Sequence, residues 1–457
     1  MIPAVPQKLL LAGFGAANQA AARSLLARGH DLIVFDDRSD AGVPGEGAGR
    51  SADSAAATLG LELEASPDAA RLDTLVRSVG AVVPTPGLPH DHPVLAAAAA
   101  HGVATMSEFD LAAAWDSRPV AAITGTSGKT TVTETAAAAL TASGVAAAAA
   151  GNNDLPLVSA IDRGDTEVFV VEASSFRLGH SRSFEPGTAC WLNFGPDHLD
   201  VHGSLAAYEA AKASLWRRLP ASGTAVANLD DPTVMSHLRA DRASWTFSTG
   251  SAGAAWRLED DMLTGPHGEL VAVEELPRAL PHDIANALAA AACAVAAGAS
   301  IDGARRALRD CRPGAHRLQR IAVVGDVLYI DDSKATTPHA TVAALRSFER
   351  VVLIAGGRNK GLDLSALRAA VATVRSVVTL GEAADELAAV FAGVRAVQEA
   401  PDMDSAVALA AAAAEPGDTV MLSPACASFD RYRGYAERGE DFSRAVAEHA
   451  RSRISAA

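Results

Sequence analysis

Cysteine is scarce in this chain. Its 457 residues include four cysteines, Cys190, Cys293, Cys311 and Cys426, which lie far apart and without the spacing of a metal site. This pattern excludes a disulfide-stapled scaffold and a cysteine-ligated metal cluster. It suits a protein of the reducing cytosol, where thiols stay free.

Basic residues are few relative to acidic ones. Lysine and arginine number 39 against 54 aspartates and glutamates, which gives a formal net charge of −15. This balance argues against nucleic acid or an anionic membrane as the main partner. Phosphate groups must therefore be bound by local loops and single cations rather than by a basic surface.

Strongly apolar runs are also lacking, because the longest ones consist mainly of alanine. They are too weakly apolar to span a bilayer. The amino end has no charged segment or cleavage site typical of a secretory leader. We therefore expect a cytoplasmic protein with no membrane partner and no nucleic-acid partner.

A glycine loop is the most informative feature that is present. An apolar run, Val120–Ile123, precedes it, and a helical pattern continues to Leu140. This strand, loop and helix order is typical of a phosphate-binding loop, and an ordinary turn before a helix is the simpler alternative. The residues that we expect to bind ATP phosphates are Gly125, Thr126, Ser127, Gly128, Lys129, Thr130 and Thr131.

The amino-terminal segment resembles half of a doubly wound nucleotide-binding unit. A strand runs into Gly13 and Gly15, and a second strand ends at Asp36. The third glycine of a dinucleotide fingerprint is absent, which disfavours a nicotinamide cofactor and leaves a nucleotide-sugar diphosphate as an open alternative. A purely structural cap is the alternative. The substrate contacts expected here are Gly15, Ala16, Ala17 and Asp36, with Thr85, Pro86 and Gly87 after a later strand.

The length favours about three domains. We predict boundaries at residues 1–115, 116–313 and 314–457, because linker-like sequence surrounds Trp115–Pro119 and Arg312–Gly314. The predicted class is α/β. The amino-terminal and carboxyl-terminal domains are expected to be Rossmann-like, and the central domain to hold a mostly parallel sheet of the phosphate-loop ATPase type.

Two residues, Glu172 and His198, are candidates for a metal centre. Glu172 ends an apolar run, where a Mg²⁺ ligand would lie beside a phosphate loop, although a solvated strand-end carboxylate is the alternative. His198 follows another strand and is flanked by acids. Lys212 lies in an alanine-rich helix, where a lysine is ordinarily a solvated surface charge.

The motifs together resemble the Mur ligases of peptidoglycan synthesis, and most of all the branch that adds D-glutamate. The resemblance covers nearly the whole chain. Its marks are the glycine loop, Gly151-Asn152, Glu172-Ala173-Ser174-Ser175-Phe176, Asp197-His198-Leu199-Asp200-x-His202, Tyr208-x-x-Ala211-Lys212, Asn286–Ala290, His316-Arg317, Asp331–Thr336, Gly356-Gly357-x-x-Lys360-Gly361 and Ser423-Pro424-Ala425-x-Ala427–Asp430.

The resemblance implies roles for these residues. Lys129 and Thr130 would hold the ATP phosphates and Mg²⁺, Glu172 and His198 would bind the two Mg²⁺ ions, and Lys212 would carry a CO₂-derived carbamate that also binds metal. Asn286 would contact adenine, Arg317 the γ-phosphate and Asp332 the ribose. Further substrate contacts would be Asn152, Ser174 and Arg177, and an amino-acid pocket would comprise Lys334, Thr336, Lys360, Ser428, Phe429 and Tyr435.

The implied reaction is ATP-dependent addition of D-glutamate to UDP-N-acetylmuramoyl-L-alanine through an acyl phosphate. Alternatives are a related ligase that uses L-glutamate or a secondary-metabolism substrate, a folylpolyglutamate synthase, a regulator without catalysis, and a small-molecule phosphotransferase. The sequence does not distinguish D- from L-glutamate. A monomer is the expected state.

Four residues at three places depart from the family pattern. Ser127 stands where asparagine is usual, Asn153-Asp154 replaces isoleucine-glycine, and Arg177 replaces glutamine. We predict that Arg177 contacts the nucleotide-sugar substrate, since a guanidinium binds carboxylate or phosphate with two hydrogen bonds. The alternative is an ion pair between Arg177 and Asp154.

Overall fold

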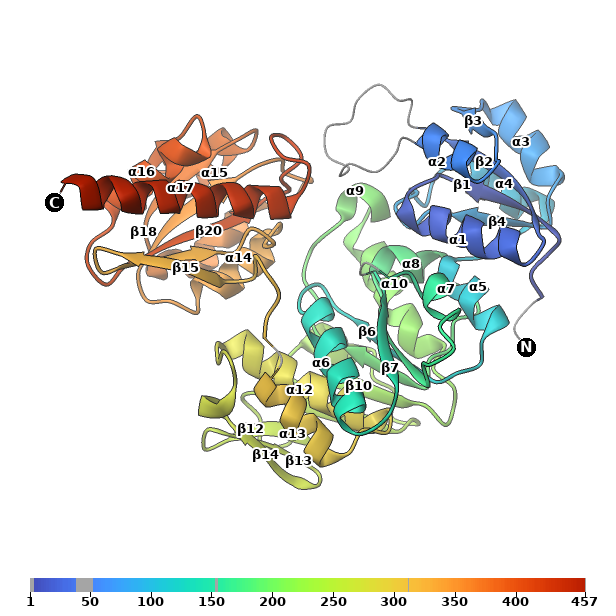
Figure 1. Ribbon diagram of the computed structural model, residues 1–457, viewed down its shortest axis with the longest axis horizontal. Helices are drawn as coiled ribbons and strands as arrows, with labels where there is room; N and C mark the ends of the chain where they lie inside the picture. Colours follow the sequence, from blue (N-terminus) through green and yellow to red (C-terminus); the bar gives the residue numbers. More distant parts are fainter. Residues whose placement is uncertain (1–3, 38–51, 153–154, 311, 457) are drawn as a thin grey trace. The chain divides into compact units, whose positions relative to one another are not determined.

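The computed structural model describes residues 4–37, 52–152, 155–310 and 312–456. Within these ranges the strands form three sheets, two in a first compact unit and one in a second (Figure 1). The second unit also includes the short segment Gly195–Asp200. Each unit is described by itself.

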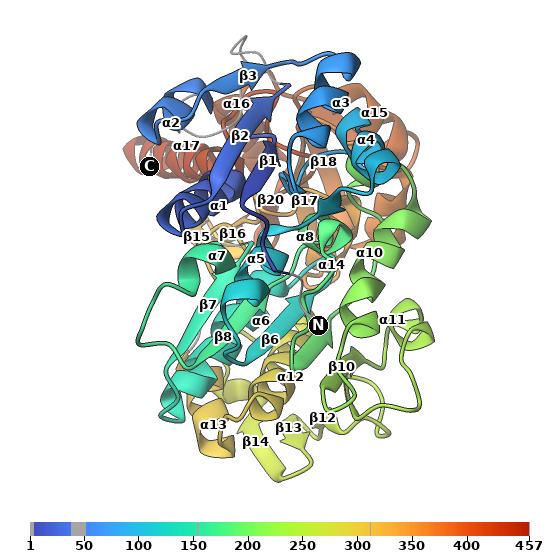
Figure 2. The same cartoon turned by 90° about the vertical axis from the view of Figure 1, so that its right-hand side faces the viewer.

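The amino-terminal sheet is parallel, in the order β3-β2-β1-β4-β5. Alternate residues of β1 face opposite sides of the sheet: Leu9 and Leu11 pack with α1 and α2, and Leu10 packs with α3 and α4. Helices α3 and α4 lie side by side (Figure 2). The elements are β1 Lys8–Ala12, α1 Ala16–Ala27, β2 Asp31–Asp36, α2 Ala52–Thr58, β3 Leu63–Ala65, α3 Ala69–Arg77, β4 Ala81–Pro84, α4 Pro93–His101, β5 Ala104–Thr105 and α5 Glu108–Trp115.

The central sheet has the order β14-β13-β12-β11-β10-β9-β6-β8-β7. It is parallel except at β12, β13 and β14, which form an antiparallel edge. Its strands are β6 Val120–Thr124, β7 Ala147–Gly151, β8 Val168–Glu172, β9 Thr188–Trp191, β10 Thr224–Asn228, β11 Ser244–Ser248, β12 Trp256–Glu259, β13 Met262–Gly265 and β14 Gly268–Ala272. Its helices are α6 Lys129–Ala142, α7 Leu157–Ala160, α8 Ser175–His180, α9 Leu199–His202, α10 Leu205–Arg217, α11 Pro232–Ser236, the 3₁₀ helix η1 Val273–Glu275, α12 Pro281–Ala296 and α13 Ile301–Asp310.

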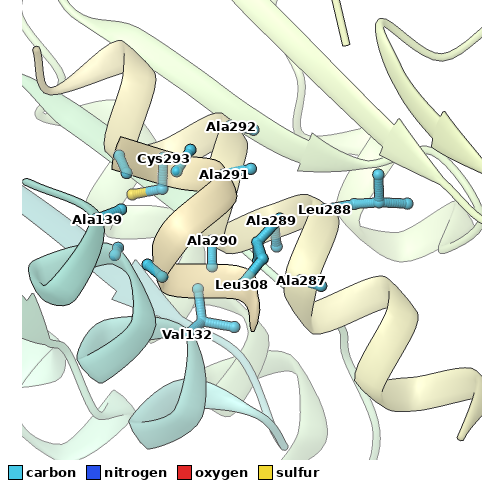
Figure 3. Close-up of a cluster of buried hydrophobic side chains, with 14 of the residues drawn as sticks. Val132, Ala139, Ala287, Leu288, Ala289, Ala290, Ala291, Ala292, Cys293 and Leu308 are labelled. Carbon is cyan, nitrogen blue, oxygen red and sulfur yellow. The ribbon is translucent and has the colours of Figure 1, made fainter. Parts of the chain in front are cut away.

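Alanine-rich helices cover one face of this sheet. The run from Ala287 to Ala294 in α12 is buried, and it packs against Val132 and Ala139 of α6 and Leu308 of α13 (Figure 3). Small side chains let the three helices approach closely while still removing apolar surface from water. The composition bias therefore serves a helical core beside the phosphate loop.

The second unit contains a sheet in the order β15-β16-β20-β17-β18-β19, parallel except for β15. Helices α16 and α17 pack on one face, where Phe442 and Val446 meet strand residues such as Ile354, and α14 and α15 contact the sheet elsewhere. The elements are β15 Gln319–Val324, β16 Val327–Asp331, α14 Pro338–Leu345, β17 Val351–Gly356, the 3₁₀ segment η2 Leu364–Thr373, β18 Val374–Leu380, α15 Ala384–Phe391, β19 Ala396–Glu399, α16 Met403–Ala413, β20 Thr419–Ala425 and α17 Tyr435–Ala456.

The predicted α/β class is confirmed by these mostly parallel sheets. The domain boundaries at 115 and 313 stay a prediction, because the residue contacts separate two units rather than three. In the described ranges, every helix is too short or too polar to cross a bilayer.

Candidate functional site

The phosphate loop connects β6 to α6, in the predicted context. Gly128 has a φ of +86°, and a Cβ there would stand 2.5 Å from Oδ1 of Asn286. Glycine thus serves both the backbone conformation and the approach of Asn286. The backbone amides of Thr126 and Ser127 donate to Oδ1 of Asn193 at 3.0 and 2.9 Å. The loop is therefore held by Asn193, which lies two residues after the end of β9, and is closely approached by Asn286 of α12.

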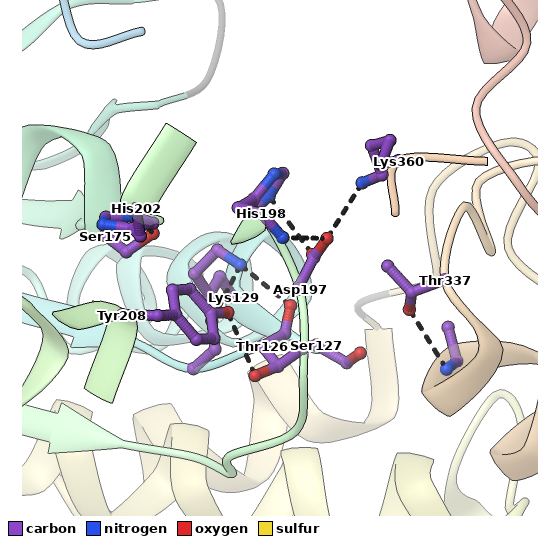
Figure 4. Close-up of polar contacts among 12 residues, drawn as sticks. Thr126, Ser127, Lys129, Ser175, Asp197, His198, His202, Tyr208, Thr337 and Lys360 are labelled. Carbon is purple, nitrogen blue, oxygen red and sulfur yellow. Dashed lines mark hydrogen bonds and ion pairs between the residues drawn. The ribbon is translucent and has the colours of Figure 1, made fainter. Parts of the chain in front are cut away.

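Lys129 begins α6 and folds back over this loop. Its Nζ donates to the carbonyl oxygens of Gly125 at 2.9 Å and of Thr126 at 3.0 Å (Figure 4). Thr130 and Thr131 follow in the first turn and are half-buried. The helix amino terminus and the ammonium place positive potential at the loop, which is what a phosphate-binding site requires.

Lys212 lies behind the phosphate loop rather than on the surface. Its exposed fraction is 1%, so the interpretation as a solvated charge is wrong. Nζ donates to the carbonyl oxygen of Gly125 at 2.7 Å and stands 4.6 Å from the ring centre of Tyr208. The Tyr208 hydroxyl lies 3.2 Å from Oγ1 of Thr126 (Figure 4). Helix α10 thereby couples a buried amine to the phosphate loop.

Glu172 at the end of β8 fits a cation site. Its side chain is only 4% exposed, so the solvated alternative is wrong. Oε1 accepts a hydrogen bond from Nδ2 of Asn152 at 3.4 Å, and Oε2 is buried with no hydrogen-bond partner among the described residues. An unsatisfied buried carboxylate oxygen is costly unless a cation compensates it.

The oxygen-bearing side chains of Glu172 and Thr130 are suitable ligands for Mg²⁺. Carboxylate and hydroxyl oxygens, here from Glu172 and Thr130, are the ligands that this hard cation prefers. In the described part of the chain, no three histidine, cysteine, aspartate or glutamate side chains are grouped to hold a metal ion.

Asp197 connects His198 and Lys360 in the second unit. Its Oδ2 lies 3.1 Å from Nε2 of His198, and its Oδ1 lies 2.9 Å from Nζ of Lys360 (Figure 4). His198 has a φ of +55°, a conformation that is unusual for a residue with a side chain. The predicted metal ligand and the predicted pocket lysine are therefore brought together by one buried carboxylate.

The predicted nucleotide-sugar residues gather at the carboxyl edge of the amino-terminal sheet. Oδ2 of Asp36 accepts from the amide of Phe14 at 2.7 Å, and a Cβ on Gly13 would stand 2.5 Å from Cγ2 of Thr85. The loops after β1, β2 and β4 thus meet where ligands bind in open α/β sheets. Asn18, which stands near the position of the missing third glycine, is buried and donates to the carbonyl oxygens of Gly13 and Val83 at 2.8 and 3.0 Å.

Arg177 forms an ion pair that neither sequence interpretation included. Its side chain is 7% exposed and pairs with Glu108 of α5, which is 2% exposed. Oε1 of Glu108 also accepts from the amide of Val158 at 2.7 Å. Asp154, the alternative partner, lies outside the described residues. Glu108 therefore balances the charge that Arg177 adds, and contact of Arg177 with substrate stays a prediction.

Three histidines meet at the carboxyl end of α8, the helix that also carries Arg177. The ring centres of His90, after β4, and His180, in α8, are 4.7 Å apart, and His202 of α9 lies 5.2 Å from His90. Nε2 of His180 lies 3.1 Å from the carbonyl oxygen of Leu88. Burial, with repulsion from His90, lowers the pKa of His180 to about 4. His180 is therefore neutral near pH 7.

The carboxyl edge of the second unit's sheet assembles the remaining candidates. Asp332 accepts from Oγ of Ser423 at 2.9 Å and from the amide of Leu318 at 3.1 Å. Nζ of Lys334 donates to the hydroxyl of Tyr435 at 2.9 Å. Further along these loops, Ser428 is buried, Phe429 is 43% exposed, and Arg317 and Thr336 are half-buried.

Two family models match this chain. The model described as Mur ligase middle domain matches residues 123–294, and the one described as Mur ligase, glutamate ligase domain matches residues 316–426. The UDP-N-acetylmuramoylalanine–D-glutamate ligase of Frankia casuarinae is 42% identical over 96% of this chain and 93% of its own length. The enzyme of the same name from Thermobifida fusca is 36% identical over 96% and 98%. The chain belongs to the Mur ligase family.

Solved structures share the fold of this Mur ligase. A pseudomurein peptide ligase type C from Methanothermus fervidus superposes with a TM-score of 0.61 at 18% identity, covering 96% of this chain and 99% of that one. A UDP-N-acetylmuramate-alanine ligase from Thermotoga maritima gives 0.60 at 17% identity, covering 97% and 99%. At such identities the likeness concerns the fold alone.

Sequence reasoning missed several residues that shape the sites of this Mur ligase. Asn193 lies two residues after the end of β9, so the strand-end rule that identified Glu172 would also have found it. Glu108 and Arg438 gave no such signal, because Arg177 lies 69 residues from Glu108, and the acceptors of Arg438 lie on three loops that are 12, 82 and 105 residues away. Only the packing of distant elements reveals their contacts.

Proposed function

We propose that this Mur ligase joins D-glutamate to the free carboxylate of UDP-N-acetylmuramoyl-L-alanine, with conversion of ATP to ADP and phosphate. The product is a peptidoglycan precursor. The observation that carries the proposal is the 42% identity, over 96% of the chain, to the ligase of that name from Frankia casuarinae. The ordered phosphate loop with Glu172 and Lys212 beside or behind it supports the ATP-dependent half.

The chemistry requires activation of a poor electrophile. A carboxylate oxygen of the substrate attacks the γ-phosphorus, the bond to the β-phosphate oxygen breaks, and an acyl phosphate forms. Lys129 and Arg317 stabilise the charge that develops on the transferred group. The glutamate amine then attacks the acyl carbon, phosphate leaves, and the amine loses a proton as the amide forms.

The substrate sites follow from the residues at the sheet edges. The nucleotide sugar would contact the loops around Asp36 and Thr85, with Asn152, Ser174 and Arg177 farther along the substrate. Adenine would lie against Asn286 and the ribose against Asp332. The glutamate pocket would be lined by Lys334, Thr336, Lys360, Ser428, Phe429 and Tyr435, whose lysines supply cations for its carboxylates.

Two Mg²⁺ ions are part of the proposal, held by Thr130, Glu172, His198 and a carbamate on Lys212, and they would act as Lewis acids toward phosphoryl and acyl oxygens. Burial favours the neutral amine of a lysine. The neutral nitrogen of Lys212 attacks CO₂, an N–C bond forms, and one proton passes to solvent. The resulting carbamate presents two oxygens in place of an ammonium.

Product formation tests the proposed reaction. The purified protein, ATP and Mg²⁺ are incubated with UDP-N-acetylmuramoyl-L-alanine and either D-glutamate, L-glutamate or no amino acid. We expect ADP release and a new amide, detected by mass spectrometry, only with D-glutamate. Amide formation with L-glutamate would establish the alternative ligase. Phosphate transfer without an amide would establish a phosphotransferase, and inactivity in every arm a regulator.

Replacement of Lys212 by alanine tests the carbamate. We expect a nearly inactive variant that formate or acetate partly rescues, because a small carboxylate can replace the carbamate oxygens. Lys8→Ala, at an exposed position, is the control and should keep full activity. Full activity of Lys212→Ala, or an intact mass without the carbamate in active protein, would refute the assignment.

A cytoplasmic location and a monomeric state complete the proposal. Both remain predictions from sequence, and sedimentation of the purified protein would check the second.

A further inference from the structure

The first turn of α17 contributes a buried guanidinium to the second unit. Arg438 is 2% exposed. Burial lowers its pKa to about 10, with Asp430 acting in the opposite direction, so the side chain is charged at neutral pH. A buried charge of this kind is costly unless its donors are satisfied.

All five N–H groups of Arg438 find acceptors. Nε donates to Oγ of Ser333 at 3.0 Å, and Nη2 donates to the Ser333 carbonyl oxygen at 2.8 Å. Nη1 donates to the carbonyl oxygen of Gly356 at 3.3 Å, and both Nη1 and Nη2 donate to that of Cys426 at 3.2 Å. One planar group thus engages three separate loops, as only arginine can.

These three loops carry the proposed glutamate pocket. Ser333 precedes Lys334, Gly356 leads into the segment that holds Lys360, and Cys426 lies two residues before Ser428. They leave the sheet at the carboxyl ends of β16, β17 and β20, which are neighbouring strands. Their relative positions therefore decide the shape of the pocket.

The proposed ribose contact is held differently. Asp332 accepts hydrogen bonds from Ser423 and from the amide of Leu318. Its own amide donates to the carbonyl oxygen of Leu422 at 2.8 Å. Because none of these contacts involves Arg438, loss of the guanidinium should displace the pocket loops more than Asp332.

We propose that Arg438 is a positioning residue for the amino-acid substrate, which it serves by setting the loops after β16, β17 and β20 relative to one another. The inference rests on the proposed ligase function. Arg438 does not touch the substrate in this scheme, since every one of its donors is engaged. It acts through Ser333, Gly356 and Cys426.

Arg438→Lys in the full-length protein is the decisive variant, because it keeps the charge and removes the planar fork. We expect KM for D-glutamate to rise about tenfold or more, as small misplacements of binding groups are costly, while KM for ATP changes by less than about twofold. Arg444→Lys, on the same helix at a position 44% exposed, is the matched control and should change neither constant.

A second variant covers the case in which Arg438→Lys does not fold. Ser333→Ala removes the hydroxyl that accepts from Nε of Arg438 and donates to the carbonyl oxygen of Tyr435 at 2.7 Å. We expect a smaller rise, about threefold, in KM for D-glutamate and again no effect on KM for ATP. Thermal unfolding of each variant is recorded alongside the kinetics.

The outcomes separate this inference from the proposed function. If the wild-type protein forms no amide with any amino acid, the proposed function is wrong and the inference falls with it. If the wild type is active, but the folded variants raise both KM values equally or lose only thermal stability, Arg438 is merely structural. A selective rise in KM for D-glutamate supports the positioning role.

Discussion

The phosphate loop after β6 and the loop cluster at the carboxyl end of the second unit's sheet hold their residues by different means. In the phosphate loop, Lys129 contacts the carbonyl oxygens of Gly125 and Thr126, which are at most four residues away. In the loop cluster, Arg438 reaches acceptors as far as 105 residues away. The phosphate loop therefore combines this local contact with distant support from Asn193 and Lys212, 66 residues from Ser127 and 87 from Gly125, whereas in the loop cluster one guanidinium joins three loops.

This difference distinguishes residues that act in the reaction from residues that hold segments of the chain together. In the phosphate loop, backbone conformation turns the amides inward, and Lys129 adds a cation for phosphate. Arg438 and the Glu108–Arg177 pair instead form contacts between segments that are distant along the chain. Substitution should therefore affect turnover in the first class and pocket geometry or stability in the second.

The largest expected effect tests the first class. Lys129→Ala should lower kcat by about 10²–10³, roughly 3–4 kcal/mol, because the transferred phosphoryl group loses a cation. The melting temperature should stay close to that of the wild type, since the loop keeps its glycines. Steady-state ADP release and circular dichroism measure the two effects. A variant that keeps more than about a tenth of kcat would contradict this role of Lys129.

The Glu108–Arg177 pair offers the sharpest test of the second class. Arg177→Gln should lower the free energy of unfolding by about 3 kcal/mol, because it leaves the buried Glu108 unpaired. Urea denaturation provides the measurement. Adding Glu108→Gln to the same protein should recover much of the loss.

The control for that pair is Arg239→Gln, which breaks an ion pair whose two side chains are 57% and 61% exposed. It should leave stability unchanged. Calorimetric binding of UDP-N-acetylmuramoyl-L-alanine to Arg177→Gln separates the two roles of Arg177. About tenfold weaker binding would support a direct substrate contact, and unchanged binding would leave only the ion pair.

The next largest effect is expected from acid, which should lower the free energy of unfolding by protonating His180. The pKa of His180 is lowered to about 4 in the folded protein, below the value near 6.5 of an unfolded chain. The unfolded state then binds the extra proton between these values, so stability is present above about pH 6.5 and is lost as the pH falls toward 4. His90, His202 and Arg182 are the charged neighbours that oppose protonation.

The expected loss at His180 is about 2 kcal/mol of unfolding free energy between pH 7 and pH 5. His180→Gln should flatten this part of the stability profile. His267→Gln, at an exposed position, should leave the profile unchanged. A profile of the same slope in His180→Gln and wild type would show that other groups cause the acid loss.

The smallest effect is expected in the glutamate pocket. Lys360→Ala and Ser428→Ala should each raise KM for D-glutamate about tenfold, near 1.4 kcal/mol, and spare KM for ATP. The effect of Lys360 is limited because its ammonium already pairs with Asp197 at 2.9 Å. Arg368→Ala, exposed in the same unit, serves as control. Equal effects on both substrates would remove these residues from the pocket.

Much of the fold could be predicted from local patterns. The apolar runs before Gly13 and before Glu172, Leu9–Leu11 and Val168–Val171, are buried parallel strands, as their composition indicated. The strand-end rule placed Asp36 and Glu172 at sheet edges, and both are buried there. These predictions succeeded because they depend on the alternation of strand, loop and helix along the chain.

The environment of charged side chains could not be predicted in the same way. Lys212 was interpreted from its helix alone as solvated, yet α10 packs it beneath Gly125, 87 residues earlier. The ion pair of Arg177 with the buried Glu108 has no signal in the residues around Arg177, and the predicted contact with substrate stays a prediction. Whether a charged side chain is buried depends on which helices and strands cover it, and the residues next to it in the sequence do not determine this.

The sequence by itself determined the phosphate loop, the succession of parallel strands and the family to which the chain belongs, because each depends on residues a few positions apart or on motifs in fixed order. Only the tertiary structure decided that Lys212 lies buried, that Glu108 balances Arg177, and that Arg438 joins three loops. Those contacts require the strand order within each sheet and the packing of helices upon it. They arise from long-range burial, which removes polar groups from water and requires a hydrogen-bond partner for each.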